Sequence, residues 1–337
     1  MKKLLLLVCT ISTVLACQSI PSIDDPNNNA DEVEVLKWKW LNTGFEDYSQ
    51  KRIIYDEAFG EGNSLRLHQS MCIYADRAFC INDGIECKVL DLRTKEWLVS
   101  DDLPDKSHHN NAQFSNTFLS SSDKYPLLLL TRGDYPPSQN DLIVVRVSEE
   151  SNRFVYSVVK TIHVKIKEAE YCGSWVVDDE NDKLFLYCMT TGDWRVKDGV
   201  NHFCIFSFNL PCITSSEDVT LGYEDVLERW DYPYLIHQGG VYYNGYLLFN
   251  VQSMGPYNGK KIASSKDLIL VNSENGDIEA IMPLDEKNET EGISIYDNRL
   301  YVSFKEGSKS QSSKSIVFNL NDYTLPSSIL ARKKRRR

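Results

Sequence analysis

The sequence predicts an all-β fold, and three observations support this prediction. The 337 residues include 18 Tyr, 13 Phe and 6 Trp, an aromatic content of 11% that suits strand-rich cores. The chain shows no amphipathic helix of ordinary length, since residues 224–230 are at most a short helical turn. Short apolar segments separated by tight turns recur instead along most of its length. A chain this long forms one domain only in a closed repeat architecture.

The first sixteen residues are predicted to be a signal peptide. Lys2 and Lys3 precede an apolar run, 4–15, that is too short to span the roughly 30 Å hydrocarbon core of a bilayer. The segment Val14-Leu15-Ala16-Cys17 resembles a bacterial lipobox, in which the cysteine is lipidated and becomes the first mature residue. This resemblance implies lipidation of Cys17. The alternative is an ordinary signal peptide in which Cys17 has no special role.

Both flanks of the body are predicted to be extensions. Residues 17–32 are polar and rich in Pro, Asn and Asp, which indicates a flexible tether behind the lipidated cysteine. Lipid anchoring then places the protein in the cell envelope as an outer-membrane lipoprotein, on the surface or the periplasmic face. Residues 326–337 form a basic tail. This tail either attracts anionic lipid or polysaccharide, or is a solvated extension without a partner.

The charge distribution argues against nucleic-acid binding. The net charge is −11, and eight of the 37 basic residues lie at the two ends of the chain. The remaining body carries 29 basic against 48 acidic residues. Because phosphate contacts need a clustered positive surface, we expect no nucleic-acid partner.

Five hairpins of similar pattern run through the body. Each has a short apolar strand, a turn that is mostly built from Asp, Asn, Gly or Arg, and a second aromatic or β-branched strand. Turn pairs such as Asn244-Gly245 and Asp297-Asn298 tolerate the positive φ angles that two-residue hairpins need. The hairpins lie at 71–80, 112–130, 175–188, 241–249 and 293–304.

Further strands complete each repeat. Hydrophobic segments follow the hairpins at 88–92, 142–147, 203–208, 268–271 and 315–320, so the repeating unit is a four-stranded meander. Such units, repeating every roughly 40 to 65 residues, are typical of propeller blades. Residues 33–60 supply one or two more strands, which either complete the last blade or belong to a sixth. We therefore predict a β-propeller of five or six four-stranded antiparallel blades over residues 33–325; a β-sandwich is the alternative.

Seven cysteines remain outside the signal peptide and lipobox. Their odd number leaves at least one without an intrachain partner, and their spacing fits no structural zinc site. Folding the first hairpin about Asp76 is expected to bring Cys72 opposite Cys80, and Cys172 is expected opposite Cys188. Buried free thiols are favoured over disulfides, because directly opposed strand cysteines have imperfect geometry. The seven are Cys72, Cys80, Cys87, Cys172, Cys188, Cys204 and Cys212.

Polar residues lead into each hairpin and form the candidate site. In a propeller the innermost strands line a central channel, so equivalent positions would meet at one channel mouth. Imidazoles, amides and carboxylates there can bind sugar hydroxyls, coordinate a divalent ion or move protons. The alternative is that they satisfy neighbouring backbone groups. The predicted ligand-binding residues are His68, Gln69, His109, Asn110, Asn111, His237, Gln238, Glu289 and Glu291.

No motif identifies catalytic residues or a nucleotide cofactor. The chain has no nucleophile elbow, no HExxH, no phosphate-binding GxxxxGK[ST] loop and no dinucleotide fingerprint. The one cofactor that the pattern allows is a divalent metal ion, with His68, His109 and His237 as its expected ligands.

The segments around His68, His109, His237 and Glu291 also resemble secreted or lipid-anchored propeller proteins of five to six blades from Bacteroides-type bacteria. The resemblance spans about residues 33–325 and implies the fold and an envelope location. Some polysaccharide lyases and glycoside hydrolases are also propellers, with His/Gln metal sites or paired carboxylates in the channel. The three histidines with Gln238 are loosely similar to the former.

Three functional hypotheses follow. The favoured one is a lipid-anchored envelope propeller that binds a glycan, a peptide or a partner protein at its channel face. The second is a metal-assisted carbohydrate-active enzyme, a polysaccharide lyase or glycosidase, that uses the histidines of the channel mouth. The third is a structural component of an envelope complex. A binding protein is favoured because no complete catalytic set is identified.

Overall fold

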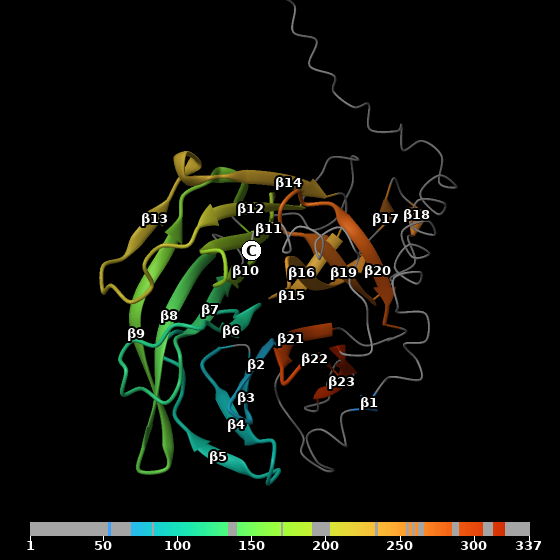
Figure 1. Cartoon of the computed structure of the whole chain (residues 1–337). Coiled ribbons are helices and arrows are strands. Elements are labelled where there is room, and N and C mark those ends of the chain that lie inside the picture. The colour runs from blue at the N-terminus through green and yellow to red at the C-terminus, as the bar shows by residue number, and fades with distance from the viewer. Residues whose placement is uncertain are drawn as a thin grey trace, which may run out of the picture.

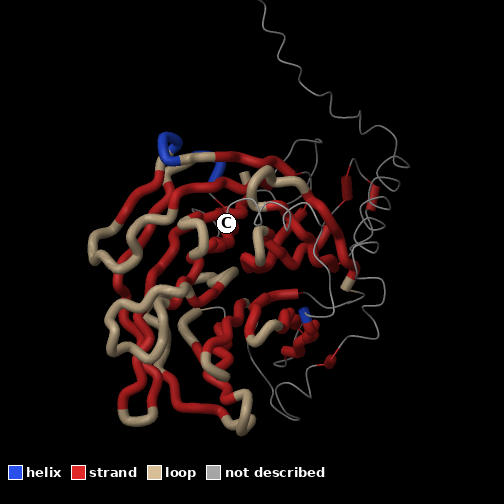
Figure 2. Tube along the Cα trace, viewed as in Figure 1, coloured by secondary structure: helices blue, strands red, loops and turns tan. Residues whose placement is uncertain are grey.

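The computed structural model describes residues 53–54, 69–82, 84–133, 140–169, 171–190, 203–232, 235–253, 256–257, 260–261, 266–284, 290–305 and 313–320. Most of these residues form strands that are joined by loops and turns, and two short 3-10 turns are η3 (Lys167–Ala169) and η4 (Tyr223–Asp225) (Figure 2). None of the helices within these ranges is long and apolar enough to cross a membrane. The predicted signal peptide, tether and basic tail lie outside the described residues.

The described strands form antiparallel units of four strands, which we call blades 1 to 5 (Figure 1). Within each of the first four blades the chain meanders from the innermost strand to the outermost one. Blade 1 contains β2 (Ser70–Tyr74), β3 (Arg77–Ile81), β4 (Cys87–Asp91) and β5 (Trp97–Ser100). Blade 2 contains β6 (Ala112–Phe114), β7 (Leu128–Gly133), β8 (Asn140–Glu150) and β9 (Arg153–Val164). Blade 3 contains β10 (Tyr171–Asp178), β11 (Lys183–Met189), β12 (Phe203–Asn209) and β14 (Glu228–Tyr232). Blade 4 contains β15 (Leu235–Tyr243), β16 (Tyr246–Ser253), β19 (Lys266–Asn272) and β20 (Ile278–Pro283).

Blade 5 is assembled from both ends of the described chain. Its inner strands are β21 (Thr290–Tyr296), β22 (Arg299–Lys305) and β23 (Ser313–Asn319), and its outermost strand is β1 (Ile53–Ile54). Ile53 pairs with Val317 and Ile54 with Ile316 in antiparallel register. Of the two alternatives that the sequence left for residues 33–60, the described strand β1 therefore supports completion of the last blade, and the described residues form five blades. This pairing ties the two ends of the ring together, so that neither end blade is left without a neighbour.

Two parallel strand pairs connect the outer edges of blades 1 to 3. β5 pairs in parallel with β9, with Val99 opposite Arg153, which joins blades 1 and 2. β13 (Val219–Leu221) leaves blade 3 and also pairs in parallel with β9, with Val219 opposite Ile162. A further two-stranded hairpin, β17 (Pro256–Tyr257) and β18 (Lys260–Lys261), lies between β16 and β19 in the sequence. Parts of the β9 edge are thereby covered rather than exposed.

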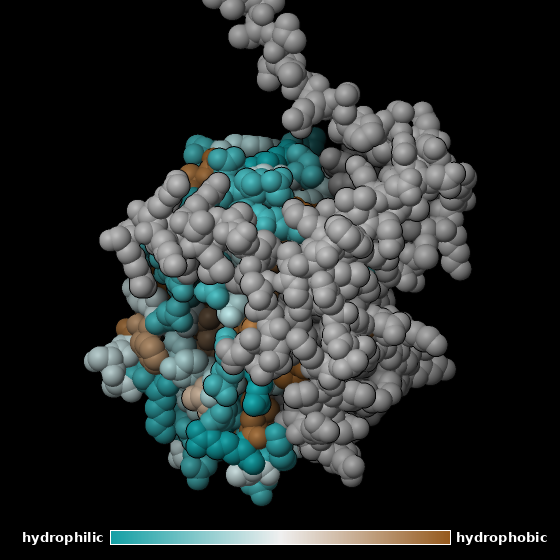
Figure 3. Space-filling view, turned by 45° about the vertical axis from the view of Figure 1, so that its right-hand side comes forward, coloured by the Kyte–Doolittle hydropathy of each residue, from teal (hydrophilic) through white to brown (hydrophobic). Residues whose placement is uncertain are grey.

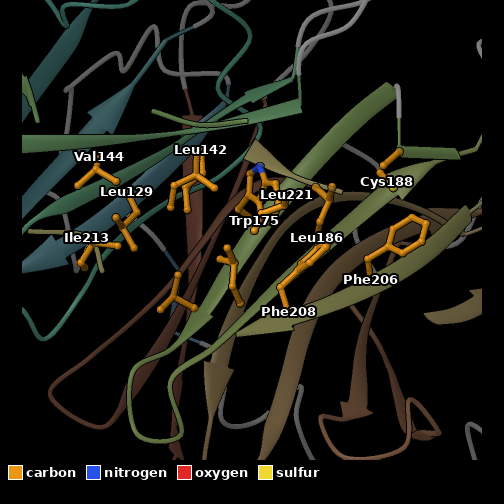
Figure 4. Packing of buried hydrophobic residues seen from close by; sticks show 14 of the residues in the cluster. Leu129, Leu142, Val144, Trp175, Leu186, Cys188, Phe206, Phe208, Ile213 and Leu221 are labelled. Atoms are coloured by element: carbon orange, nitrogen blue, oxygen red, sulfur yellow. The ribbon is translucent and has the colours of Figure 1, made fainter. Parts of the chain in front are cut away.

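The buried hydrophobic side chains of the described residues form five clusters, each of which lies between two neighbouring blades. This placement follows from the period-2 alternation of strands, because the two faces of each blade pack against different neighbours. The cluster between blades 2 and 3 includes Leu142, Trp175 and Leu186 (Figure 4). The other four clusters join blades 1 and 2, 3 and 4, 4 and 5, and 5 and 1. A complete set of five interfaces establishes that the ring is closed.

The innermost strands contact one another around the middle of the molecule. β21 contacts β2, β2 contacts β6, β10 contacts β15 and β15 contacts β21, while β10 meets blade 2 through β7. Figure 1 shows β2, β6, β10, β15 and β21 around the centre, with β5, β9, β14 and β20 toward the rim. The described part of the surface in Figure 3 is mostly hydrophilic, with small hydrophobic patches. The β-propeller prediction is confirmed.

Tight turns close the inner hairpins where the sequence predicts them. Asn244 and Gly245 have φ values of 51° and 91°, and Asp297 and Asn298 have values of 46° and 56°. Positive φ at both central positions gives the backbone twist that a two-residue hairpin needs. The first hairpin turns at Ala75 and Asp76 in the same way, with φ values of 47° and 59°.

The turn at Ala75-Asp76 corrects one sequence-based prediction. Because the turn is centred between these two residues, Cys72 pairs with Phe79 and Cys80 pairs with Met71. Cys72 therefore packs between blades 1 and 2, whereas Cys80 packs between blades 1 and 5. The two cysteines lie on opposite faces of the blade, since a shift of one residue in register moves a side chain to the other face.

Candidate functional site

The histidine and asparagines before β6 lie inside the protein. His109 is 0% exposed, and its Nδ1 and Nε2 lie 3.0 and 3.2 Å from the carbonyl oxygens of Thr131 and Asp105. Asn110 is also buried and donates from Nδ2 to the carbonyl of Gly173, at 3.1 Å. In this structure the imidazole and the amide are thus engaged with backbone carbonyls.

Asn111 joins three blades at the channel. Its Nδ2 donates to the carbonyl of Trp175 on β10, at 2.8 Å, and to that of Gly240 on β15, at 2.7 Å. Its side-chain oxygen is buried without a hydrogen-bond partner among the described atoms. These bonds place Asn111 beside the innermost strands of blades 3 and 4, where its amide satisfies backbone groups; a role in ligand binding stays a prediction.

The remaining predicted site residues are only partly described. His68 and Glu289 lie outside the described residues. Gln69 is buried directly before β2, Gln238 is half-buried on β15, and Glu291 is buried on β21. His237 pairs with Val251 next to a bulge in β15, and its side chain is outside the described part of the structure. Whether the histidines meet at one point therefore stays a prediction.

The predicted metal site is likewise not decided. Among the described residues, no group of three or more His, Cys, Asp or Glu side chains is arranged to hold a metal ion. His109 is the one expected ligand whose side chain is described, and carbonyl oxygens face both of its nitrogens. A site that includes His68 and His237 remains a prediction.

An ion-pair network holds the segment that carries His109. The Arg132 guanidinium bonds to both carboxylate oxygens of Asp105, and its second arm lies 2.9 Å from Asp141. His163 adds a contact of 3.1 Å to the other oxygen of Asp141. Burial favours the neutral form of Asp105, but the hydrogen bonds and charge of Arg132 outweigh it, so the pKa of Asp105 is lowered. This network fixes the approach to β6.

A pocket of about 300 Å³ lies at the opposite end of the innermost strands, beside the hairpin turns. Every blade contributes to its wall. The lining residues are Ile73 from blade 1; Gln113, Phe114 and Asn116 from blade 2; Val177, Asp179 and Glu180 from blade 3; Val241, Tyr242, Tyr243 and Asn244 from blade 4; and Ile293, Ser294 and Ile295 from blade 5. A cavity with residues from five blades exists only because the ring is closed.

Hydrogen bonds between blades fix the shape of this pocket. The Gln113 side chain accepts a bond from the backbone N–H of Val177 and donates to the carbonyl of the same residue, at 3.1 and 3.2 Å. On the other side, Ser294 Oγ accepts a bond of 3.2 Å from the backbone N–H of Ile73. Side chains of one innermost strand thus form hydrogen bonds to backbone groups of the next, as a neighbouring strand would in a sheet. The pocket is preformed.

The acidic turn of blade 3 gives the pocket its charge. Asp179 is half-buried and accepts a 3.1 Å bond from the backbone N–H of Asn116. Burial raises the pKa of Asp179 to about 6, and the neighbouring charges of Asp178 and Asp182 add to this rise. Burial also raises the pKa of Tyr242, whose hydroxyl accepts a 3.3 Å bond from Asn181. The pocket therefore combines a desolvated carboxyl group with tyrosine hydroxyls and apolar side chains.

Sequence reasoning missed this pocket because it considered only the beginnings of the innermost strands. A usable pattern was present at their ends. The acidic turn 178–182 and the pair Tyr242-Tyr243 occupy equivalent places directly before or within hairpin turns. Equivalent positions in the repeated hairpins predict the histidines at one end of the channel. By the same reasoning they predict these acidic and tyrosine residues at the other end.

Neither protein families nor curated proteins give a match to this sequence. Solved structures with a similar arrangement include the PQQ-bound aldose sugar dehydrogenase of Streptomyces coelicolor, with a TM-score of 0.42, 9% identity, and coverage of 74% of this chain and 93% of that one. A putative glycoside hydrolase from Parabacteroides distasonis has a TM-score of 0.41, 8% identity, and coverage of 77% and 88%. A family 43 endo-arabinanase from Bacillus licheniformis has a TM-score of 0.38, 10% identity, and coverage of 76% and 94%. At these values the neighbours do not indicate what this chain binds.

Proposed function

We propose that this chain is a lipid-anchored protein of the cell envelope that binds a glycan in the pocket at the hairpin-turn end of its channel. The observation that carries the proposal is the pocket itself, to which all five blades contribute side chains. Its volume of about 300 Å³ falls at the small end of the range for ligand sites. That size suits one or two sugar units of a longer chain rather than a large buried cofactor.

The chemistry of the wall fits sugars. Asp179 and Glu180 supply carboxylate oxygens that accept hydrogen bonds from hydroxyl groups. Tyr242 and Tyr243 combine an apolar ring with a polar tip, a pairing suited to the alternating CH and OH groups of a sugar. Ile73 and Ile293 add apolar surface from the opposite blades. A sugar hydroxyl that donates to Asp179 would replace part of the water that burial removes from this carboxylate.

The envelope location is the second part of the proposal. It is supported by the lipobox-like segment at Cys17 and by the polar stretch 17–32 that follows it. A flexible chain of that length has a root-mean-square reach of about 20 Å. The propeller would then be held near the membrane while its channel remains accessible to material in the surrounding space.

Binding to envelope polysaccharides and their oligosaccharides tests the function. We expect Asp179→Asn to weaken glycan affinity by about tenfold, since one charge-assisted hydrogen bond contributes roughly 1.5 kcal/mol. Calorimetric titration of purified protein with the best-binding oligosaccharide measures this. Glu217→Gln is the matched control, because Glu217 is exposed and lies outside the pocket wall. Equal affinity of Asp179→Asn and the native chain would rule this pocket out as the site.

Two other ligand classes are outcomes of the same experiment. The protein could bind no glycan but bind a peptide or an envelope protein, and lose that binding in Asp179→Asn. This result would support the pocket as the binding site but show that its ligand is not a glycan. Shortening of the oligosaccharide during titration would instead favour the enzymatic hypothesis, in which the channel carries catalytic groups.

A further inference from the structure

Cys188 and Cys204 are direct neighbours across two antiparallel strands. In the register of β11 and β12 they are exact partners, and their sulfur atoms are 3.8 Å apart. Opposed residues in an antiparallel pair have Cα atoms about 4.5–5.5 Å apart, within the range of about 4.4–6.8 Å in which disulfides form. The sequence favours free thiols for directly opposed cysteines, and here both thiols are free, but their sulfurs are already in contact. A disulfide needs these sulfurs to approach to a bonded distance of about 2.05 Å.

We propose that Cys188 and Cys204 form a disulfide when the chain folds in the presence of a disulfide oxidant. Each sulfur loses its proton, one S–S bond forms between them, and the two electrons reduce the S–S bond of the oxidant to two thiols. The oxidant is a thiol–disulfide exchange partner, such as an oxidised dithiol protein of the envelope or glutathione disulfide in the test tube. The inference does not depend on the glycan proposal.

The surroundings of the pair determine when the bond can form. Both side chains are 0% exposed and belong to the cluster between blades 2 and 3, where Cys188 lies near Leu186 and Phe206 (Figure 4). Burial also raises the pKa of the Cys188 thiol, and exchange requires the thiolate. Oxidation is therefore expected during folding, before blade 2 covers blade 3. Once formed, the bond is shielded from reductants.

The other described cysteines lack such a partner geometry. Cys72 and Cys80 lie on opposite faces of blade 1. The Cys87 thiol accepts a hydrogen bond of 3.4 Å from Tyr156. Cys212 is exposed, and its thiol lies 3.3 Å from the Thr214 hydroxyl. Among the cysteines whose side chains are described, 188 and 204 are the pair whose sulfurs are in contact.

The bond would stabilise a specific part of the molecule. Met189 and Phe203 are the next paired residues, and they end β11 and begin β12. The disulfide would therefore lie at the base of the connection 190–202, on the side of blade 3 where β10 begins. It would fix the ends of this connection at the end of the channel where the sequence placed the histidines.

Refolding under defined redox conditions tests the proposal. The protein is refolded with glutathione disulfide, denatured with an alkylating agent but no reductant, digested and examined by mass spectrometry. We expect a linked pair of β11 and β12 peptides that is two hydrogens lighter than the separate peptides, with Cys72, Cys80, Cys87 and Cys212 alkylated. Complete alkylation of Cys188 and Cys204 would overturn the proposal. A Cys172–Cys188 link would also overturn it; Cys172 falls in the irregular stretch of β10 between Tyr171, which pairs with Met189, and Ser174, which pairs with Tyr187.

Two alanine variants separate the bond from simple packing. For the oxidised native chain we expect thermal unfolding in the presence of a reductant to give a Tm several degrees lower than without it, because the bond is reduced once the chain opens and the unfolded state loses a constraint. Cys204→Ala should abolish this dependence on reductant. Cys80→Ala removes an equally buried thiol from another cluster and should retain it. Loss of the dependence in both variants, or retention in both, would contradict the assignment.

Discussion

Asp179 shows how the surroundings of one residue set its chemistry. Its carboxyl group lines the channel pocket, belongs to an acidic turn that also contains Asp178 and Asp182, and accepts a bond from one backbone N–H. Burial and the charges of Asp178 and Asp182 disfavour the ionised form, and the bond from Asn116 offsets only part of this effect. A carboxylate that is poorly solvated in the free protein gains more from a hydroxyl donor than a fully hydrated one does. Because burial disfavours the ionised form, protonation of Asp179 also changes the free energy of unfolding.

Stability measured against pH tests this description of Asp179. The pKa is raised from 3.8 to about 6 on folding, so between these values the folded protein binds more protons than the unfolded chain. The contribution of this group to the free energy of unfolding is therefore full below about pH 4 and is lost as pH rises through about 6. We expect Asp179→Asn to be more stable than the native chain at pH 7, by about 1–2 kcal/mol after allowance for partial exposure.

Denaturant unfolding of both proteins at pH 4 and pH 7 measures the difference. It should be close to zero at the lower pH, because the native carboxyl group is then protonated and Asn is a similar neutral group. Glu217→Gln, at an exposed residue outside the pocket, is unfolded under the same two conditions as a control. A native chain that is as stable as Asp179→Asn at pH 7 would mean that the carboxylate is better solvated than its surroundings indicate.

At the scale of elements, the innermost strands are joined by side chains rather than by a continuous ladder. Asn111 bonds to β10 and β15, Gln113 and Thr131 bond to β10, and Ser294 bonds to β2. Each bond satisfies a backbone group on the innermost strand of another blade. The five hairpins themselves were predictable, because alternation and turn residues are local signals. Their side-chain connections were not, since they join residues more than forty positions apart.

Asn111→Ala tests whether such connections stabilise the ring. The change leaves the carbonyls of Trp175 and Gly240 without this donor inside the protein, and an unsatisfied buried group costs about 1–3 kcal/mol. We expect the free energy of unfolding to fall by about 2–4 kcal/mol, measured by denaturant unfolding. Asn116→Ala is the control, because the Asn116 side chain is exposed and the contact that it makes to Asp179 comes from its backbone. A loss in Asn111→Ala no larger than in the control would contradict the structural role.

At the scale of the whole molecule, closure of the ring decides which residues meet. The sequence left open whether residues 33–60 complete the last blade or belong to a sixth, and the pairing of β1 with β23 shows that Ile53 and Ile54 join the last blade. The sequence could not predict which end of the channel would form a pocket, because that depends on how five blades pack together. His109 illustrates the difference: its position before β6 follows from the repeat, but its burial against Thr131 follows from contacts within the folded blade. Local pattern thus predicts the elements and their order, while long-range packing determines the site.

The proposed attachment to a membrane through Cys17 can also be tested. The first described strand, β1, lies at the outer edge of blade 5, which is assembled around the innermost strand β21 (Figure 1). The pocket is lined by residues of the innermost strands and their turns, so we expect a change at the proposed anchor to leave the pocket intact. Lipid chains on Cys17 would hold the protein by about 0.8 kcal/mol for each buried methylene group.

We expect Cys17→Ala to move the protein from the membrane fraction to the soluble fraction on cell fractionation, with unchanged glycan affinity. Cys212→Ala, which removes an exposed thiol from the body, should stay with the membranes. Membrane retention of Cys17→Ala would show that another segment holds the protein there.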